Sequence, residues 1–263
     1  MDKPGPRQHH TEQRESPLTA SLRWLPKDLR SYCLRQLPQS TAYPATRDAI
    51  AASAPFLGRL SPERVKQELD KTLEQVRCPS TAFAVWQSTG AFATLVPALA
   101  SASPEALAVT DHLAQPGSAK RPARRAIRFA GLLLGLGAKA AEQVLVSLRA
   151  SRHETQAVAV LIDRWHAHGQ SIADALVAQQ PIADVAVRRW VAGIGRLQIG
   201  SFMRLAAGVW HAARARGTTV PTDRAARQLY RRMLRVALRD PIDLGSLAVD
   251  GDDLRRAGIP AGP

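Results

Sequence analysis

Apolar residues recur along this chain at the three- and four-residue intervals of amphipathic helices. Val65, Leu69, Leu73 and Val76 are spaced so that they share one helical face. No segment alternates apolar and polar residues over the length of a strand. The pattern predicts an all-α fold, an irregular array of roughly ten helices without an α/β domain.

Capping residues and glycines set the ends of the predicted helices. Ser61, Pro62 and Glu63 form a helix start, because the serine caps, the proline suits the first turn and the acid faces the positive helix end. Thr222 is expected to cap a final long helix that runs to Asp240. The other predicted helices cover residues 45–57, 79–90, 101–113, 123–136, 138–148, 153–168, 171–179, 181–194 and 200–216.

The pattern divides the chain into three regions. Residues 1–40 are rich in Pro, Gln, His and charge, which is typical of a poorly ordered segment. This segment contains an ambiguous helix candidate over 21–37, and a linker is predicted over 38–44. Two helical regions follow, over 41–115 and 120–263, with a loop at 115–118 between them.

Hydropathy predicts neither a secreted nor a membrane protein. The first 20 residues are polar and lack the apolar core of a signal peptide. The longest apolar run, over 129–138, is about half the ~20 residues that a membrane span requires. Its glycines, Gly131 and Gly135, favour close packing between helices in water. We expect a cytoplasmic protein.

Basic residues outnumber acidic ones and are concentrated in two segments. The chain has 36 Lys and Arg against 22 Asp and Glu, a net charge of +14. Residues 120–152 hold eight basic residues and one acid, and residues 188–239 hold twelve arginines and one acid. Charge of one sign repels itself unless an anion offsets it, which favours nucleic acid or a membrane surface as partner. Two solvated helical faces are the alternative.

The basic segments supply nine candidate RNA contacts. In the last long helix four arginines recur at three- and four-residue spacing and form one outer stripe, opposite an inward face of Tyr230, Met233, Leu234 and Ala237. Guanidinium groups along a helix suit a row of phosphates. The full set is Arg124, Arg125, Arg128, Arg188, Arg189, Arg224, Arg227, Arg231 and Arg235.

Other residue types point to no catalytic or metal site. Cys33 and Cys78 cannot form a disulfide framework, and Cys78 is expected to be a buried or idle thiol. His166 and His168 lie two positions apart on a helix and so face different sides, which favours ordinary surface histidines. The five tryptophans are predicted as core residues, and stacking on RNA stays open for Trp24 and Trp190.

Two blocks of sequence resemble one enzyme family. Residues 41–73 read TAYPATRDAIAASAPFLGRLSPERVKQELDKTL, and residues 82–99 read AFAVWQSTGAFATLVPAL. Both resemble the neck region of bacterial CCA-adding tRNA nucleotidyltransferases and poly(A) polymerases, where a helix pair precedes a Thr-Gly and a Leu-x-Pro-x-Leu. Residues 247–263, LAVDGDDLRRAGIPAGP, are similar to the tail motif of that family. The resemblance implies a neck-like RNA-binding region over 41–115 and a body- and tail-like basic region over 120–263.

The catalytic motifs of that family have no counterpart here. Its head domain carries a Gly-Ser and an Asp-x-Asp whose carboxylates hold Mg²⁺. Gly245-Ser246 and Asp250-Gly251-Asp252 are too close together, and we interpret Asp250, Asp252 and Asp253 as turn and cap residues. The nucleotide-selecting motif is missing from residues 23–27. We therefore expect the head, with its Mg²⁺ and CTP or ATP, to lie outside this chain, which would have no catalytic residue, metal or cofactor of its own.

The resemblance implies a function in tRNA 3′-end processing. The chain is expected to be the tRNA-binding helical portion of a CCA-adding-type tRNA nucleotidyltransferase, holding the acceptor and T-arm. Its expected partner is tRNA or other RNA, not a membrane, and a separate catalytic head subunit is a further candidate. Whether it acts in an enzyme is left open. One alternative is a fragment of a whole enzyme, and another is a non-catalytic scaffold that binds polyanions or proteins.

Overall fold

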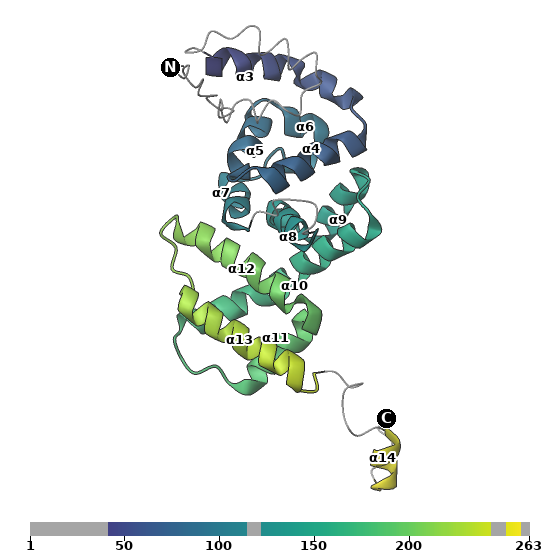
Figure 1. Cartoon of the computed structure of the whole chain (residues 1–263), viewed down its shortest axis with the longest axis vertical. Helices are drawn as coiled ribbons and strands as arrows, with labels where there is room; N and C mark the ends of the chain where they lie inside the picture. Colours follow the sequence, from purple (N-terminus) through teal and green to yellow (C-terminus); the bar gives the residue numbers. More distant parts are fainter. Residues whose placement is uncertain (1–41, 115–121, 243–250, 259–263) are drawn as a thin grey trace, which may run out of the picture. The chain divides into compact units, whose positions relative to one another are not determined.

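Regular structure is helical throughout the part of the chain that the computed structural model describes, namely residues 42–114, 122–242 and 251–258. These ranges contain twelve α-helices, five 3₁₀ segments and no strand (Figure 1). The predicted all-α fold is confirmed. The helix candidate over 21–37, the loop over 115–118, Trp24, Cys33 and Asp250 lie outside the described residues.

Four helices begin at a hydroxyl side chain that accepts a hydrogen bond from the backbone N–H three residues later. Such a cap stabilises a helix by about 1 kcal/mol. Both starts predicted from capping residues, at Ser61 and Thr222, are confirmed. The capped helices are α4 (Pro62–Gln75, capped by Ser61), α7 (Pro104–Ala108, by Ser103), α10 (Arg152–Val177, by Ser151) and α13 (Asp223–Arg239, by Thr222).

The chain divides into two compact units, Met1–Ser53 and Ala54–Pro263. The first unit contributes α3 (Ala42–Ser53), which begins inside the stretch predicted as a linker, so that the linker prediction over 42–44 is wrong. The remaining elements of the second unit are η1 (Ala54–Arg59), α5 (Pro79–Ser88), α6 (Ala91–Leu95), η2 (Pro97–Leu99), η3 (Val109–His112), α8 (Pro122–Leu133), η4 (Leu134–Leu136), α9 (Ala138–Ser147), α11 (Asp184–Ile194), η5 (Arg196–Gln198), α12 (Ile199–Arg214) and α14 (Gly251–Arg256).

An aromatic cluster forms the core of the first helices of the second unit. The ring of Phe92 in α6 lies 5.8 Å from that of Phe83 and 5.4 Å from that of Trp86, both in α5. All three side chains are buried. The predicted apolar face of α4 is also confirmed, because Val65, Leu69 and Leu73 are buried.

The side chain of Leu113 packs against helices α8 and α12, which follow this part of the unit. A Cβ added to Gly208 of α12 would lie 2.3 Å from the Leu113 Cδ2, and one added to Gly131 of α8 would lie 2.6 Å from its Cδ1. A side chain at either glycine would therefore force the Leu113 side chain to move. The predicted regions 41–115 and 120–263 thus share a core over their described residues 54–114 and 122–242.

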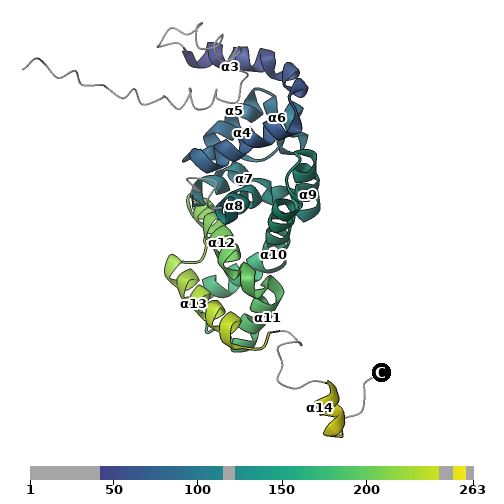
Figure 2. The same ribbon diagram turned by 45° about the vertical axis from the view of Figure 1, so that its right-hand side comes forward.

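Helix α12 occupies the centre of the second half of the unit. It contacts η3 and α8 on one side and α10, α11 and α13 on the other (Figures 1 and 2). Its buried Phe202 and Trp210 lie 6.2 Å and 6.5 Å from the half-buried ring of Trp165 in α10. Helices α11 and α13, which carry exposed arginines, both contact α12.

The sequence predicted two helices, over 153–168 and 171–179, where the structure has the single helix α10. Gly169 does not end it. The Trp165 ring folds over Gly169, and a Cβ there would lie 2.7 Å from two ring atoms. The indole ring occupies the space that a side chain at position 169 would need, so a glycine fits inside the helix there.

The predicted pivot between residues 123–136 and 138–148 is confirmed. Helices α8 and α9 are joined through η4 and Gly137, and the two helical segments bend by 119°. No single described helix is long and apolar enough to cross a membrane, although this bent pair passes the same test by length and composition.

Candidate nucleic-acid interface

Helix α13 carries its four predicted arginines on the solvent side. Arg224, Arg227, Arg231 and Arg235 are all exposed, and we call them the α13 stripe. The opposite face is buried at Leu229, Met233, Val236 and Ala237. The predicted inward face was correct for Met233 and Ala237, whereas Tyr230 and Leu234 are half-buried at its edge. The stripe extends for about 16 Å along the helix, at 1.5 Å per residue.

Carboxylates near the stripe pair with other basic side chains. Asp184 accepts a hydrogen bond from Arg232, Asp240 from Arg188 at 2.8 Å, and Asp223 from Arg214 at 2.9 Å. The Arg232 hydrogen bond lowers the pKa of Asp184, and that of Arg214 lowers the pKa of Asp223. No carboxylate in the described ranges forms an ion pair with the α13 stripe. Its charge is therefore available to an external anion.

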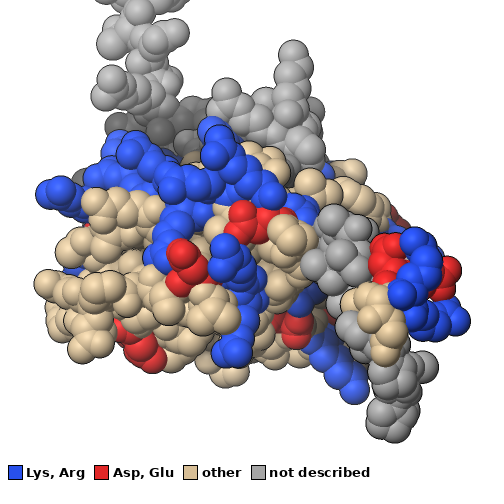
Figure 3. Space-filling view, turned by 90° about the horizontal axis from the view of Figure 1, so that it is seen from below, with Lys and Arg blue, Asp and Glu red and all other residues tan. Residues whose placement is uncertain are grey.

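Basic side chains of neighbouring helices extend this surface. Arg204 of α12 is exposed, and a Cβ added to Gly200 would lie 3.6 Å from both its Nη1 atom and the Tyr230 hydroxyl. Arg204 therefore lies beside the edge of α13. Arg204 belongs to the basic segment 188–239, but no sequence pattern distinguishes it there, because only packing brings α12 next to α13. Figure 3 shows Lys and Arg side chains gathered in a band with few acids between them.

The two predicted arginines of α11 differ in their surroundings. Both side chains are exposed, and α11 packs against α13. Arg188 pairs with Asp240, the residue that ends α13. Arg189 has no ion pair with a described carboxylate. Arg188 and Arg189 therefore lie on a helix that packs directly against the helix of the α13 stripe.

In the other basic segment, residues 120–152, Arg125 by contrast pairs with carboxylates of the protein itself. Arg125 of α8 lies 3.1 Å from Glu74, 3.3 Å from Glu154 and 3.9 Å from Asp70. Lys66 joins the same carboxylates, at 2.8 Å from Asp70 and 3.0 Å from Glu154. Arg124 is half-buried and also has a partner. A role of Arg124 and Arg125 in RNA binding stays a prediction, in competition with these contacts.

Arg128 is buried, with 1% of its surface exposed. Its guanidinium donates to the carbonyl oxygens of Leu73 at 2.7 Å, Val76 at 3.0 Å and Leu113 at 2.9 Å. A side chain held in this way cannot reach RNA, and the prediction for Arg128 is wrong. The carbonyls end α4 and η3, so the cation satisfies the unpaired acceptors and the negative dipole at two helix ends.

The tryptophans, the two histidines and the cysteine discussed from the sequence differ in how far they are buried. Trp86 and Trp210 are buried as predicted, while Trp165 and Trp190 are half-buried. His166 is exposed, and the half-buried His168 packs against Gly193 of α11; burial, with Arg164 nearby, lowers its pKa. Cys78 is exposed, contrary to a buried thiol.

Acidic residues do not gather into a metal site in the described ranges. No three His, Cys, Asp or Glu side chains there form a group that could hold a metal ion. Asp252 and Asp253 lie in the first turn of α14 and pair with Arg255 and Arg256.

One comparison relates this chain to known proteins. Residues 43–103 match a protein-family model described as "Probable RNA and SrmB- binding site of polymerase A". This segment overlaps the neck-like block of the sequence, and the match supports a relationship to the poly(A) polymerase and CCA-adding family, with RNA as a partner. The α13 stripe lies outside the matched residues. Searches of curated proteins and of solved structures gave no match.

Proposed function

We propose that this chain is the tRNA-binding helical portion of a CCA-adding-type tRNA nucleotidyltransferase and acts in tRNA 3′-end processing. The match over residues 43–103 supports RNA as the ligand. The observation that carries the proposal further is the α13 stripe, four exposed arginines on one helical face without a described carboxylate partner.

Such a surface recognises shape rather than sequence. Arginine forms bidentate contacts with phosphate oxygens, which fix the register and orientation of a nucleic acid without reading its bases. Double-stranded RNA is recognised mainly through its backbone, because its major groove is too deep and narrow for side chains. The acceptor and T-arm of tRNA form a stacked helix that offers this kind of backbone.

Nucleotide transfer itself would belong to a head domain that binds Mg²⁺ and CTP or ATP. The described residues contain no group of three His, Cys, Asp or Glu side chains that could hold a metal ion. A separate subunit that carries the head is one partner that the proposal includes. The position of RNA on the α13 stripe would orient the 3′ end toward that subunit.

The test is tRNA binding by the full chain as a function of salt concentration. In the variant Arg227→Glu/Arg231→Glu/Arg235→Glu, the reversed charges repel phosphates. We expect at least a tenfold loss of affinity and a salt dependence shallower by about two to three units in log–log slope, since each lost phosphate contact removes about 0.7–0.9. The circular dichroism spectrum should stay helical, because all three side chains are exposed.

A matched control carries the same change of net charge on α9, the segment after it and the start of α10. Lys139→Glu/Arg149→Glu/Arg152→Glu also replaces three exposed basic side chains. It should lose much less affinity than the stripe variant. Equal loss in both variants, or equal affinity for tRNA and for a single-stranded RNA of the same length, would indicate a generic polyanion binder. An unchanged slope in the stripe variant would contradict the proposal.

A further inference from the structure

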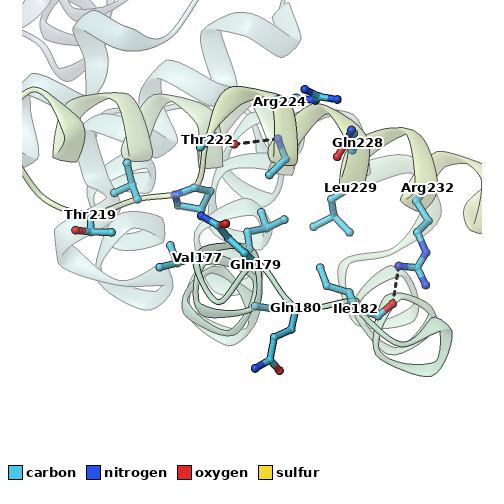
Figure 4. Close-up of a pocket in the computed structure, with 15 residues that line it drawn as sticks. Val177, Gln179, Gln180, Ile182, Thr219, Thr222, Arg224, Gln228, Leu229 and Arg232 are labelled. Atoms are coloured by element: carbon cyan, nitrogen blue, oxygen red, sulfur yellow. Dashed lines mark hydrogen bonds between the residues drawn. The ribbon is translucent and has the colours of Figure 1, made fainter.

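A pocket of about 540 Å³ opens beside the α13 stripe. Its walls come from the C-terminal end of α10, the segment that follows it, the loop before α13 and the first turns of α13 (Figure 4). Arg224 belongs both to the lining of this pocket and to the stripe. Arg224 is therefore the residue that the pocket and the stripe share.

The lining combines apolar walls with a polar rim. Leu176, Val177, Ile182 and Leu229 supply apolar side chains from two sides. Thr219, Gln179 and Gln228 add hydroxyl and amide groups, and no carboxylate lines the pocket. Pockets for small ligands are typically lined by apolar side chains with a small number of polar groups that fix the orientation of the ligand.

Gln179 has a backbone conformation that is unusual for its residue type. Its φ is +54°, in the left-handed region, two positions after the last residue of α10. Glycine normally occupies this position after a helix, because it adopts positive φ without a steric penalty. The Gln179 amide is exposed and makes no hydrogen bond within the described ranges. The side chain of Gln179 thus lines the pocket with an amide that is not hydrogen-bonded to any described group.

We propose that this pocket binds an unpaired nucleobase of the RNA whose backbone lies along the α13 stripe. The inference rests on the proposed function. The apolar side chains would cover the faces of the base, and the Gln179 amide, a donor and an acceptor side by side, would pair with its edge. Arg224 would hold the adjoining phosphate, since it lies on the border between pocket and stripe.

The test compares three RNAs that share one hairpin. The first is blunt, the second carries a four-nucleotide single-stranded extension, and the third carries an abasic extension with the same phosphates. We expect the base-bearing extension to bind about fivefold or more tightly than the abasic one, as one sequestered base would allow. Extensions at the 3′ and the 5′ end are measured separately. Equal affinity of the base-bearing and abasic RNAs at both ends would overturn the inference.

Variants of Gln179 separate its side chain from its backbone. Gln179→Gly and Gln179→Ala both remove the amide, and both should abolish most of the preference for bases while leaving blunt-hairpin affinity unchanged. Only Gln179→Gly should raise the melting temperature, because glycine relieves the positive φ. Gln180→Ala is the matched control, since the amide of Gln180 points away from α13 in Figure 4. It should keep the preference.

The outcomes distinguish this inference from the proposed function. Hairpin binding that depends on the stripe but ignores unpaired bases would overturn the pocket and leave the proposed function intact. If none of the three RNAs binds at physiological salt, the proposed function fails and the inference fails with it. A preference for bases that survives in both Gln179 variants would contradict the assignment of that residue.

Discussion

The Nη1 atom of Arg128 in α8 donates a 2.7 Å hydrogen bond to the carbonyl oxygen of Leu73 in α4. Its Nη2 and Nε atoms reach the Leu113 carbonyl at 2.9 Å and 3.2 Å. One buried cation therefore ties α8 to the ends of two elements within the first half of the second unit. Burial lowers the pKa of Arg128, but a guanidinium stays charged at any pH at which the protein is folded.

Replacing this side chain should damage stability. Arg128→Ala removes four hydrogen bonds and leaves buried carbonyl groups without partners, so we expect a loss of about 3 kcal/mol or more in the free energy of unfolding. Urea denaturation measures this. Arg231→Ala, at an exposed site, should change stability by no more than about 0.5 kcal/mol. A stable Arg128→Ala protein with weakened RNA binding would contradict the structural role.

Gly169→Ala should lower the stability of the protein, although replacing glycine by alanine stabilises most helices. Alanine in a helix interior is favoured over glycine by about 1 kcal/mol. At Gly169 the new Cβ would meet the Trp165 ring at 2.7 Å, and that ring packs on Phe202 and Trp210. We expect Gly169→Ala to destabilise the protein by about 1–3 kcal/mol, as overpacking does, and to shift tryptophan fluorescence.

The control for this substitution lies in the first turn of α12. A Cβ at Gly200 would have its nearest neighbours at 3.6 Å, which is ordinary contact. Gly200→Ala should therefore be neutral or slightly stabilising. Stabilisation by both substitutions would show that the Trp165 ring moves away from Gly169 without penalty.

Asp70 gives the stability a pH dependence. Burial raises the pKa of Asp70, and the Lys66 hydrogen bond at 2.8 Å opposes this only in part. The folded state therefore holds the proton more tightly than the unfolded state, and ionisation of Asp70 destabilises the fold. This destabilisation is absent below the ordinary pKa of 3.8 and complete above the raised pKa.

Asp70→Asn should accordingly increase the free energy of unfolding at pH 7. The difference from the wild type should shrink as the pH falls and vanish below about 3.8. Urea denaturation over a pH series measures it. A less stable Asp70→Asn protein at pH 7 would mean that the ion pairs with Lys66 and Arg125 outweigh the effect of burial.

Asp240 should moderate RNA binding. Its carboxylate holds Arg188 at 2.8 Å next to the end of α13. Asp240→Asn removes a negative charge and releases the guanidinium, so tRNA affinity should rise by about threefold at low salt, with a steeper salt dependence. Glu142→Gln on α9 makes the same change of charge at another exposed site and should have little effect. Equal tightening by both variants would assign the effect to net charge alone.

The helical fold and the stripe could be predicted from the sequence because both are local. The 3.6-residue period fixes which side chains share a face, so the exposed positions of Arg224, Arg227, Arg231 and Arg235 followed from spacing alone. Caps such as Ser61 and Thr222 act within three residues and were equally readable. The resemblance of residues 41–99 to the neck region of poly(A) polymerases and CCA-adding enzymes likewise came from sequence alone. The family match over residues 43–103 supports that relationship.

The tertiary structure alone decided which arginines are free. Arg124 and Arg128 lie four residues apart on α8, and the sequence predicted both as RNA contacts. The hydrogen-bond partners of Arg128, however, lie at the ends of α4 and η3, more than ten residues away along the chain. The ring over Gly169 and the Gln179 pocket also depend on neighbours that no local pattern specifies. Periodicity determines what a helix presents on each face, whereas burial and pairing depend on which other helix covers that face.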